Sequence, residues 1–235
     1  MLTNYAPFEC VGGDALFTLH VQRGLVQEEP LHAIFTDKSD EDMPRIEVYT
    51  KADGGWQLNI SMYRDSEVVC NLLTNADFSE ATLCVGTDDV RFAVDNATML
   101  LFAFTTASLM TLELHASVIK KGGKGYLFLG KSGTGKSTHA RQWLHAFEDA
   151  ELLNDDNPIL RMMEENGELK VRVYGSPWSG KTACYKNDSV TVQAIVKLSQ
   201  APTNELRSLR LPEAYAYVLS SSSGLKILPE MMDAL

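Results

Sequence analysis

Two segments of this chain fit the phosphate-binding pattern G-x-x-x-x-G-K-[ST]. The first, GKSGTGKS, spans residues 130–137, and the second, GSPWSGKT, spans residues 175–182. Such a loop binds phosphate when a strand leads into it and a helix begins at its end, because glycines permit the tight turn and the helix N-terminus presents backbone N–H groups. The lysine then reaches the β- and γ-phosphates, and the Ser or Thr hydroxyl binds Mg²⁺. The sequence around each segment therefore has to distinguish them.

The first segment has the required context. An apolar run, YLFL at 126–129, precedes it, and KSTHARQWLHAF at 136–147 follows with helical spacing of its apolar residues. This arrangement predicts a P-loop that binds a nucleotide, with ATP and Mg²⁺ as the expected ligands. We expect the contacts to come from Gly130, Lys131, Ser132, Gly133, Thr134, Gly135, Lys136, Ser137 and Thr138.

The second segment lacks this context. The residues that follow it, TACYKNDSVTV, are typical of a turn and then a strand, and Pro177 removes a backbone N–H that the loop would need. We expect no independent nucleotide site here. Two interpretations remain open: a structural turn with Trp178 packed on the core, or a substrate loop with Lys181 as a cation and Trp178 as a wall.

A pair of carboxylates follows the first segment at a suggestive spacing. Asp155 and Asp156 lie 19 and 20 residues after Lys136, at the end of the predicted strand AELLNDD. A strand–helix–strand connection places its two strands parallel in one sheet, so both carboxylates should lie near the loop. Mg²⁺ prefers oxygen ligands, and phosphoryl transfer to a hydroxyl benefits from a base. Two adjacent carboxylates can divide these tasks.

These residues also carry a resemblance to a known family. LHASVIKKGGKGYLFLGKSGTGKSTHARQWL and ELLNDDNPILR, within about residues 113–161, resemble HPr kinase/phosphorylase and, more distantly, ATP-type phosphoenolpyruvate carboxykinase. The resemblance implies an α/β fold in which a P-loop domain with a mixed sheet follows a small β-rich region. It also implies a Mg·ATP-dependent phosphotransferase that acts on a serine-like or small-molecule hydroxyl.

The resemblance assigns roles to individual residues. It implies that Lys136 binds the phosphates and that His115 lies near them, that Ser137 and Asp156 hold Mg²⁺, and that Asp155 is the base for the acceptor hydroxyl. One departure is Thr138, which stands where HPr kinases usually carry Glu. Another is the family's Arg-Gly-Leu-Gly signature, which is missing, with RVYGSPWSG in roughly its place. The missing signature and the early end of the chain motivate the alternative that the chain is a nucleotide-binding regulatory or assembly protein without turnover.

The remaining sequence predicts two domains, a β-rich one over 1–94 and the kinase-like one over 95–235. The apolar stretch 97–112 is shorter than the ~20 residues of a membrane span, so we expect a buried helix capped by Asp95 or Asn96. The last residues, PEMMDAL, indicate a truncated or unusually short domain. Strands are predicted at 15–21, 45–51, 56–63, 66–73, 82–86 and 90–94, and later at 112–119, 126–129, 150–156, 158–164, 169–175 and 189–200.

Composition limits the partners. The formal charge of −10, from 31 acidic against 21 basic residues, argues against a nucleic-acid partner. Residues 114–147, however, contain no Asp or Glu and six Lys or Arg, which suits a small polyanion. Four widely spaced cysteines and an N-terminus without a signal-peptide pattern predict a cytoplasmic protein that does not enter a membrane. A homo-oligomer is left open.

Overall fold

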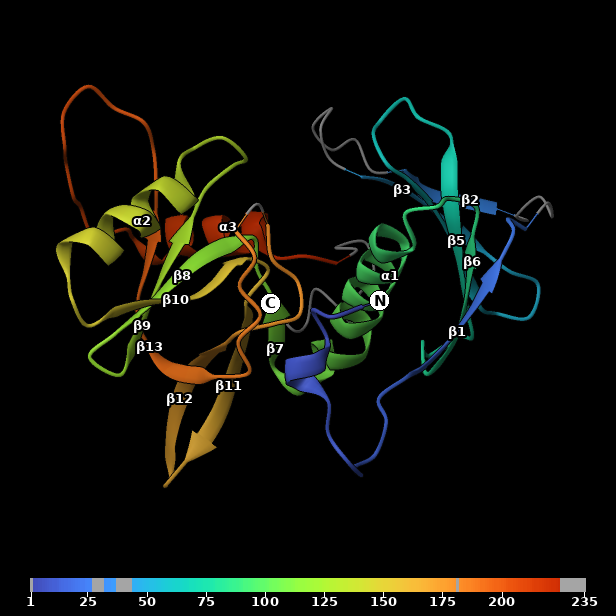
Figure 1. Cartoon of the computed structure of the whole chain (residues 1–235), viewed down its shortest axis with the longest axis horizontal. Helices are drawn as coiled ribbons and strands as arrows, with labels where there is room; N and C mark the ends of the chain where they lie inside the picture. Colours follow the sequence, from blue (N-terminus) through green and yellow to red (C-terminus); the bar gives the residue numbers. More distant parts are fainter. Residues whose placement is uncertain (1, 27–31, 37–43, 181, 225–235) are drawn as a thin grey trace. The chain divides into compact units, whose positions relative to one another are not determined.

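The computed structural model describes residues 2–26, 32–36, 44–180 and 182–224, and the chain divides into two compact units. One unit is Gly12–Thr106, and the other combines Met1–Val11 with Ala107–Leu235. Each unit is built on its own mixed β-sheet, and the described residues contain only three α-helices (Figure 1). The predicted truncation at PEMMDAL concerns residues 225–235, which lie outside the described residues.

The unit Gly12–Thr106 contains a six-stranded sheet covered by one helix. Its strand order is β1-β6-β5-β4-β3-β2, and helix α1 packs against β5 and β6. Buried side chains such as Leu58, Leu72 and Leu83 form its core, because alternate residues of each strand point to the helix-covered face. The elements are β1 (Thr18–Arg23), β2 (His32–Thr36), β3 (Arg45–Thr50), β4 (Trp56–Ser61), β5 (Val68–Thr74), β6 (Glu80–Val85) and α1 (Val90–Thr106).

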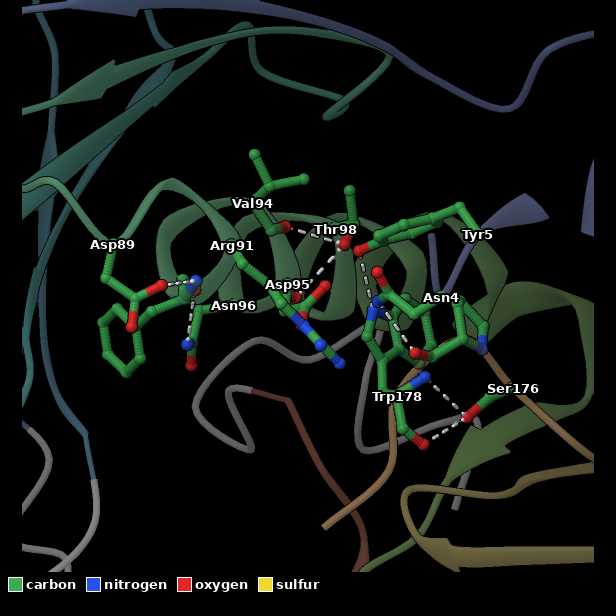
Figure 2. A network of polar contacts seen from close by, with 12 residues as sticks. Asn4, Tyr5, Asp89, Arg91, Val94, Asp95, Asn96, Thr98, Ser176 and Trp178 are labelled. Atoms are coloured by element: carbon green, nitrogen blue, oxygen red, sulfur yellow. Dashed lines mark hydrogen bonds and ion pairs between the residues drawn. The ribbon is translucent and has the colours of Figure 1, made fainter. Parts of the chain in front are cut away.

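The sheet is mixed, because β1 pairs with β6 in parallel. Two sequence predictions for this unit were wrong. The helix begins at Val90, so the strand expected at 90–94 is its first turn. Asp89, and not Asp95 or Asn96, caps it: the Asp89 Oδ1 atom accepts a hydrogen bond from Phe92 N at 2.9 Å (Figure 2).

Helix α1 is the most apolar element of the chain. Together with the short 3₁₀ turn Ala107–Leu109, it is the one described helix that is long and apolar enough, by length and composition, to cross a membrane. A core helix passes the same test, and half of this stretch is buried inside the protein. Buried positions recur at helical spacing along it, namely Ala93, Val94, Ala97, Leu100, Leu101 and Phe104.

The second unit contains a seven-stranded sheet in the order β10-β8-β9-β13-β12-β11-β7. Strand β8 is antiparallel to both β9 and β10, so β9 and β10 run parallel, as the sequence predicted. Its elements are the 3₁₀ turn Ala6–Phe8, β7 (Thr111–Glu113), β8 (Ala116–Lys121), β9 (Lys124–Leu129), α2 (Lys136–Ala146), β10 (Ala150–Asp156), β11 (Ile159–Glu165), β12 (Glu168–Tyr174), β13 (Ser189–Lys197) and α3 (Leu211–Ser221).

Two long chain segments bend within this sheet. Strands β7 and β8 follow each other with two residues between them, as do β10 and β11, yet each pair occupies distant positions in the strand order. The two segments stay paired through the bend, because Glu113 pairs with Ile159, Leu114 N donates to Pro158 O at 3.1 Å, and Ala116 pairs with Asp156. His115 and Asp156 therefore both lie at the bend.

Helices α2 and α3 cover opposite faces of the sheet. Trp143 and Leu144 of α2 pack with Ile119 and Phe128, whereas Val218 of α3 packs on the cluster that contains Val118 and Leu127. The side chains of consecutive residues in β8 and β9 thus point to opposite faces of the sheet.

The predicted α/β P-loop fold is wrong. The chain is mainly β, because a helix connects two strands of the second sheet only at α2, and 159–174 forms an antiparallel hairpin. Asn166 and Gly167 turn this hairpin with φ of +56° and +78°, a conformation that ends the strand without a helix.

Candidate functional site

The first glycine segment, residues 130–137, forms a loop between β9 and α2. Gly133 and Gly135 adopt φ of +76° and +102°, a backbone conformation that residues with a Cβ rarely adopt. The first bond of α2 runs from His139 N to Gly135 O at 2.8 Å. The N–H groups of Lys136, Ser137 and Thr138 therefore precede the intrahelical ladder and are oriented to bind an anion.

Lys136 is the most enclosed charge of this loop. Only 9 % of the residue is exposed, and its Nζ donates to Gly130 O at 3.0 Å. Burial lowers the pKa of the Lys136 ammonium and the charge of Lys197 adds to this, whereas Asp156 and Asp155 act in the opposite direction. A partly desolvated lysine with carboxylates nearby gains strongly from an anionic ligand.

His115 connects Lys136 to the acid pair. Its Nε2 lies 3.0 Å from Lys136 Nζ and 3.1 Å from Asp156 Oδ1. One ring nitrogen cannot accept a proton from the lysine and donate one to the carboxylate at the same time, so the tautomer decides which bond forms. The bend of the sheet thus gathers three of the residues that the sequence singled out.

A β-bulge sets the direction of Asp155. The register of β10 against β8 shifts between Leu152 and Asn154, after which Asp155 pairs with Ser117. Ile119 and Ser117 lie two residues apart on β8, and Ile119 packs under α2, so the shift turns Asp155 toward the face that α2 covers. Asp155 is 4 % exposed, so its carboxylate lies at a nearly closed position.

The second glycine segment borders the same carboxylates but forms no nucleotide loop. No helix follows it, as expected: the chain reaches β13 at Ser189 without regular structure. Instead, Gly180 N donates to Asp155 O at 2.7 Å, and Ser179 forms a bridge with Asp156. The segment therefore lies along the free edge of β10, where it completes the hydrogen bonding of the strand.

Buried polar contacts fix this second segment. Asn154 Nδ2 donates to Ser176 Oγ and to Trp178 O, both at 3.0 Å, while its Oδ1 accepts from Asp156 N at 3.1 Å. Trp178 is 6 % exposed, and its Nε1 donates to Tyr5 Oη at 3.1 Å (Figure 2). These contacts favour the structural interpretation of Trp178. Lys181 lies outside the described residues.

The other predicted nucleotide contacts lie on the outer part of the loop. Lys131 and Ser132 are exposed, and Lys131 O accepts bonds from Thr134 N at 3.2 Å and Thr134 Oγ1 at 2.7 Å. Thr138 lies on α2, where its Oγ1 accepts from Arg141 Nη2 at 3.4 Å. The exposed side chains of Lys131 and Ser132 can therefore turn toward a ligand.

The residues present fit a magnesium nucleotide. Ser137 and Asp156 offer the oxygen atoms that Mg²⁺ prefers, and a nucleotide-bound Mg²⁺ takes most of its ligands from phosphate and water. Among the described residues, no group of three or more His, Cys, Asp or Glu side chains could hold a metal by itself. Any magnesium bound here would therefore need phosphate oxygens to complete its coordination.

Sequence reasoning missed Glu113, Asn154 and Lys197 at this site. Burial of Glu113, at 2 % exposure, raises the pKa of its carboxyl to about 8; the Ser223 hydroxyl lowers it and the Asp156 charge raises it. An acid within the apolar run TLELHAS was the available signal for Glu113. Nothing in the local sequence marked Asn154 or Lys197, because their roles depend on contacts across the sheet.

Fold and site together define a predominantly β protein in which one strand–loop–helix unit carries a glycine loop beside two carboxylates. The chain belongs to the family of the SynChlorMet cassette protein ScmC, whose family model matches residues 82–233, about two thirds of the sequence. No curated protein matches the chain.

This membership corrects the resemblance to HPr kinase/phosphorylase and to ATP-type carboxykinase. That resemblance depended on short motifs within residues 113–161, whereas the ScmC match extends from within β6 to beyond α3. A loop pattern and an acid pair can recur in unrelated families, since phosphate binding imposes the same local requirements on each.

Proposed function

We propose that this protein binds Mg·ATP at the glycine loop 130–137 and transfers its γ-phosphate to a hydroxyl acceptor, serine-like or on a small molecule. The main support is the convergence of Lys136, His115 and Asp156, with contacts of 3.0 and 3.1 Å between three separate chain segments. An enclosed cation, an open helix N-terminus and two carboxylates together match the needs of phosphoryl transfer.

In this proposal each side chain has one task. Lys136 exchanges its bonds to Gly130 O and His115 for phosphate oxygens. Asp155 accepts the proton of the acceptor hydroxyl as the acceptor oxygen forms its bond to the γ-phosphorus; the bond from that phosphorus to the β-phosphate oxygen breaks, and ADP leaves. Ser137 and Asp156 would hold Mg²⁺, which neutralises phosphate charge.

The test uses the Asp155→Asn variant, with Asp149→Asn as the matched control at an exposed ion pair with Lys121. Transfer from γ-labelled ATP to serine peptides, glycerol and water is measured beside Mg·ATP affinity. We expect Asp155→Asn to reduce transfer ~10²–10⁴-fold, as loss of a general base does, with little change in affinity. Transfer by Asp155→Asn at the wild-type rate would refute the role of Asp155.

A second candidate is a nucleotide-dependent regulatory or assembly protein without turnover. The observation that favours it is the short contact between His115 and Asp156, because it occupies a carboxylate oxygen that a catalytic metal would use. This candidate predicts Mg·ATP binding without transfer to any acceptor, and the same experiment therefore separates the two.

The proposed setting is the cytoplasm, and the proposed partners are a nucleotide and one acceptor. No disulfide involves Cys10, Cys70, Cys84 or Cys184, which suits a reducing compartment. The net charge of −10 leaves a nucleic-acid partner unfavoured. Detection of the protein in the soluble fraction of cells after lysis and ultracentrifugation would support this location.

A further inference from the structure

Lys197 lies at the glycine loop, a position that no local sequence pattern indicates. It is the last residue of β13, which runs parallel to β9, and it pairs with Leu129, the residue before Gly130. The next residue continues the contact, since Leu198 N donates to Leu129 O at 2.8 Å. Parallel strands end at the same edge of a sheet, so Lys197 and the loop share that edge.

The segment after β13 also reaches the loop itself. Gln200 Nε2 donates to Gly133 O at 3.3 Å. The segment that follows Lys197 is thus tied to the loop region at two points, to Leu129 through Leu198 and to Gly133 through Gln200. Its backbone position is determined by these contacts and does not depend on the course of the residues beyond 200.

The ammonium of Lys197 has no balancing charge among the described residues. It is half-buried, it donates to the carbonyl of the adjacent Leu198, and it lies 5.5 Å from the centre of the Tyr217 ring. No carboxylate of the described residues lies within ion-pairing distance of it. Lys120, Lys121 and Lys186 of the same unit, by contrast, each pair with an acid.

Lys136 Nζ contacts two backbone carbonyls and His115, and that histidine also contacts Asp156. Both lysines belong to the same loop region, because Lys136 ends the glycine loop and Lys197 pairs with Leu129 just before that loop begins. Two cations at one loop, both partly out of water, gain from an anion that contacts both of them.

We propose that Lys197 is a second phosphate-binding cation of the site, which binds the polyphosphate chain of the nucleotide together with Lys136. This inference rests on the proposed nucleotide binding and adds a residue to it. The ligand class it implies is a nucleoside triphosphate or another linear polyphosphate, whose successive phosphates can each contact one of the two cations. A charged hydrogen bond of this kind contributes at least about tenfold in affinity.

The experiment is calorimetric titration of Mg·ATP and of magnesium tripolyphosphate into wild type, Lys197→Met, Lys197→Gln and Lys197→Arg. The matched control is Lys121→Met, because Lys121 also lies over an aromatic ring, 4.9 Å from the centre of Phe147, but near the opposite end of β8 from the bend. Thermal melting of each variant verifies folding. Lys197→Gln retains a donor for Leu198 O and guards against a folding defect in Lys197→Met.

We expect Lys197→Met and Lys197→Gln to weaken both ligands about tenfold or more, Lys197→Arg to stay near wild type, and Lys121→Met to match wild type. Wild-type affinity in folded Lys197→Met or Lys197→Gln would overturn the proposal while nucleotide binding stands. A loss for Mg·ATP but not for tripolyphosphate would also overturn it, by placing Lys197 at the nucleoside. If wild type binds neither ligand, the proposed nucleotide function itself fails.

Discussion

The two glycine segments share eight-residue patterns but have different structural roles. Residues 130–137 form a loop with two left-handed glycines that ends in helix α2. Residues 175–182 lead to no helix, and their described part lies along the edge of β10, where Gly180 N bonds Asp155 O. The motif G-x-x-x-x-G-K-[ST] therefore specifies a phosphate loop only where the following residues can form a helix.

Glycine has a different structural role in each of the two segments. In the first segment they provide φ values near +76° and +102°, and no atom within 4 Å would meet a Cβ at Gly133 or Gly135. In the second segment they provide space, since a Cβ on Gly175 would lie 2.0 Å from Lys186 O. Conformational freedom serves ligand binding in one segment, and close backbone approach serves packing in the other.

Nevertheless, the two segments meet at the same acid pair. Lys136 of the first segment contacts His115, which in turn contacts Asp156. The second segment supports the pair through the bond from Gly180 N to Asp155 O and through its contacts with Asn154, which accepts a bond from Asp156 N. We infer that the second segment acts on the site as a support for β10. The tests below separate binding from support.

The largest difference is expected from the two pattern lysines. Lys136→Ala should weaken Mg·ATP binding by at least about 100-fold, because the lysine makes charged hydrogen bonds to phosphate in a partly desolvated site. Lys181→Ala should bind as wild type does, because its segment does not form a phosphate loop. Calorimetric titration of both variants decides this. Equal losses in the two variants would show that both segments bind the ligand.

The first glycine of each segment provides the next comparison. Gly175→Ala should lower the free energy of unfolding by about 3 kcal/mol, because the new Cβ meets a backbone oxygen that cannot move alone. Gly130→Ala should cost less than about 1 kcal/mol, since its Cβ would lie 3.1 Å from the movable side chain of Thr134. Urea denaturation measures both. A larger loss in Gly130→Ala would reverse the assignment of support to the second segment.

Much of the local structure around the first segment was predictable. The apolar run 126–129, the glycines and the amphipathic run 136–147 indicated strand, loop and helix, and the connection rule gave the parallel pairing of β9 and β10. These features depend on neighbours in sequence or on a general rule of chain handedness. The absence of a helix after Thr182 followed from local sequence as well.

The surrounding fold was not predictable in the same way. The bend at Leu114 and His115, the bulge before Asp155 and the parallel pairing of β1 depend on contacts between residues far apart in the chain. The start of α1 was missed because β-branched and aromatic residues in VRFAV favour a strand locally, while the Asp89 cap and packing against β5 and β6 determine a helix. Family membership likewise depended on more of the chain than the motifs covered.

The last comparison concerns Glu113, which shares the bend with the acid pair that both segments border. Its pKa is raised to about 8 by burial, so the folded protein retains a proton that the unfolded chain releases near pH 4.5. Stability from this group is then complete below pH 4.5 and is lost as the pH rises through 8. Between pH 5.5 and 7.5 this amounts to at most about 3 kcal/mol.

Urea denaturation of wild type and Glu113→Gln across that range tests the effect, because the amide is always neutral and similar in shape. We expect the stability of wild type to fall relative to Glu113→Gln as the pH rises, while Glu164→Gln, at an exposed position of β11, follows wild type. Parallel curves for wild type and Glu113→Gln would mean that Glu113 is ionised in the folded state. The bend would then hold a further negative charge beside Asp156, and the site would require more positive charge than Lys136 alone supplies.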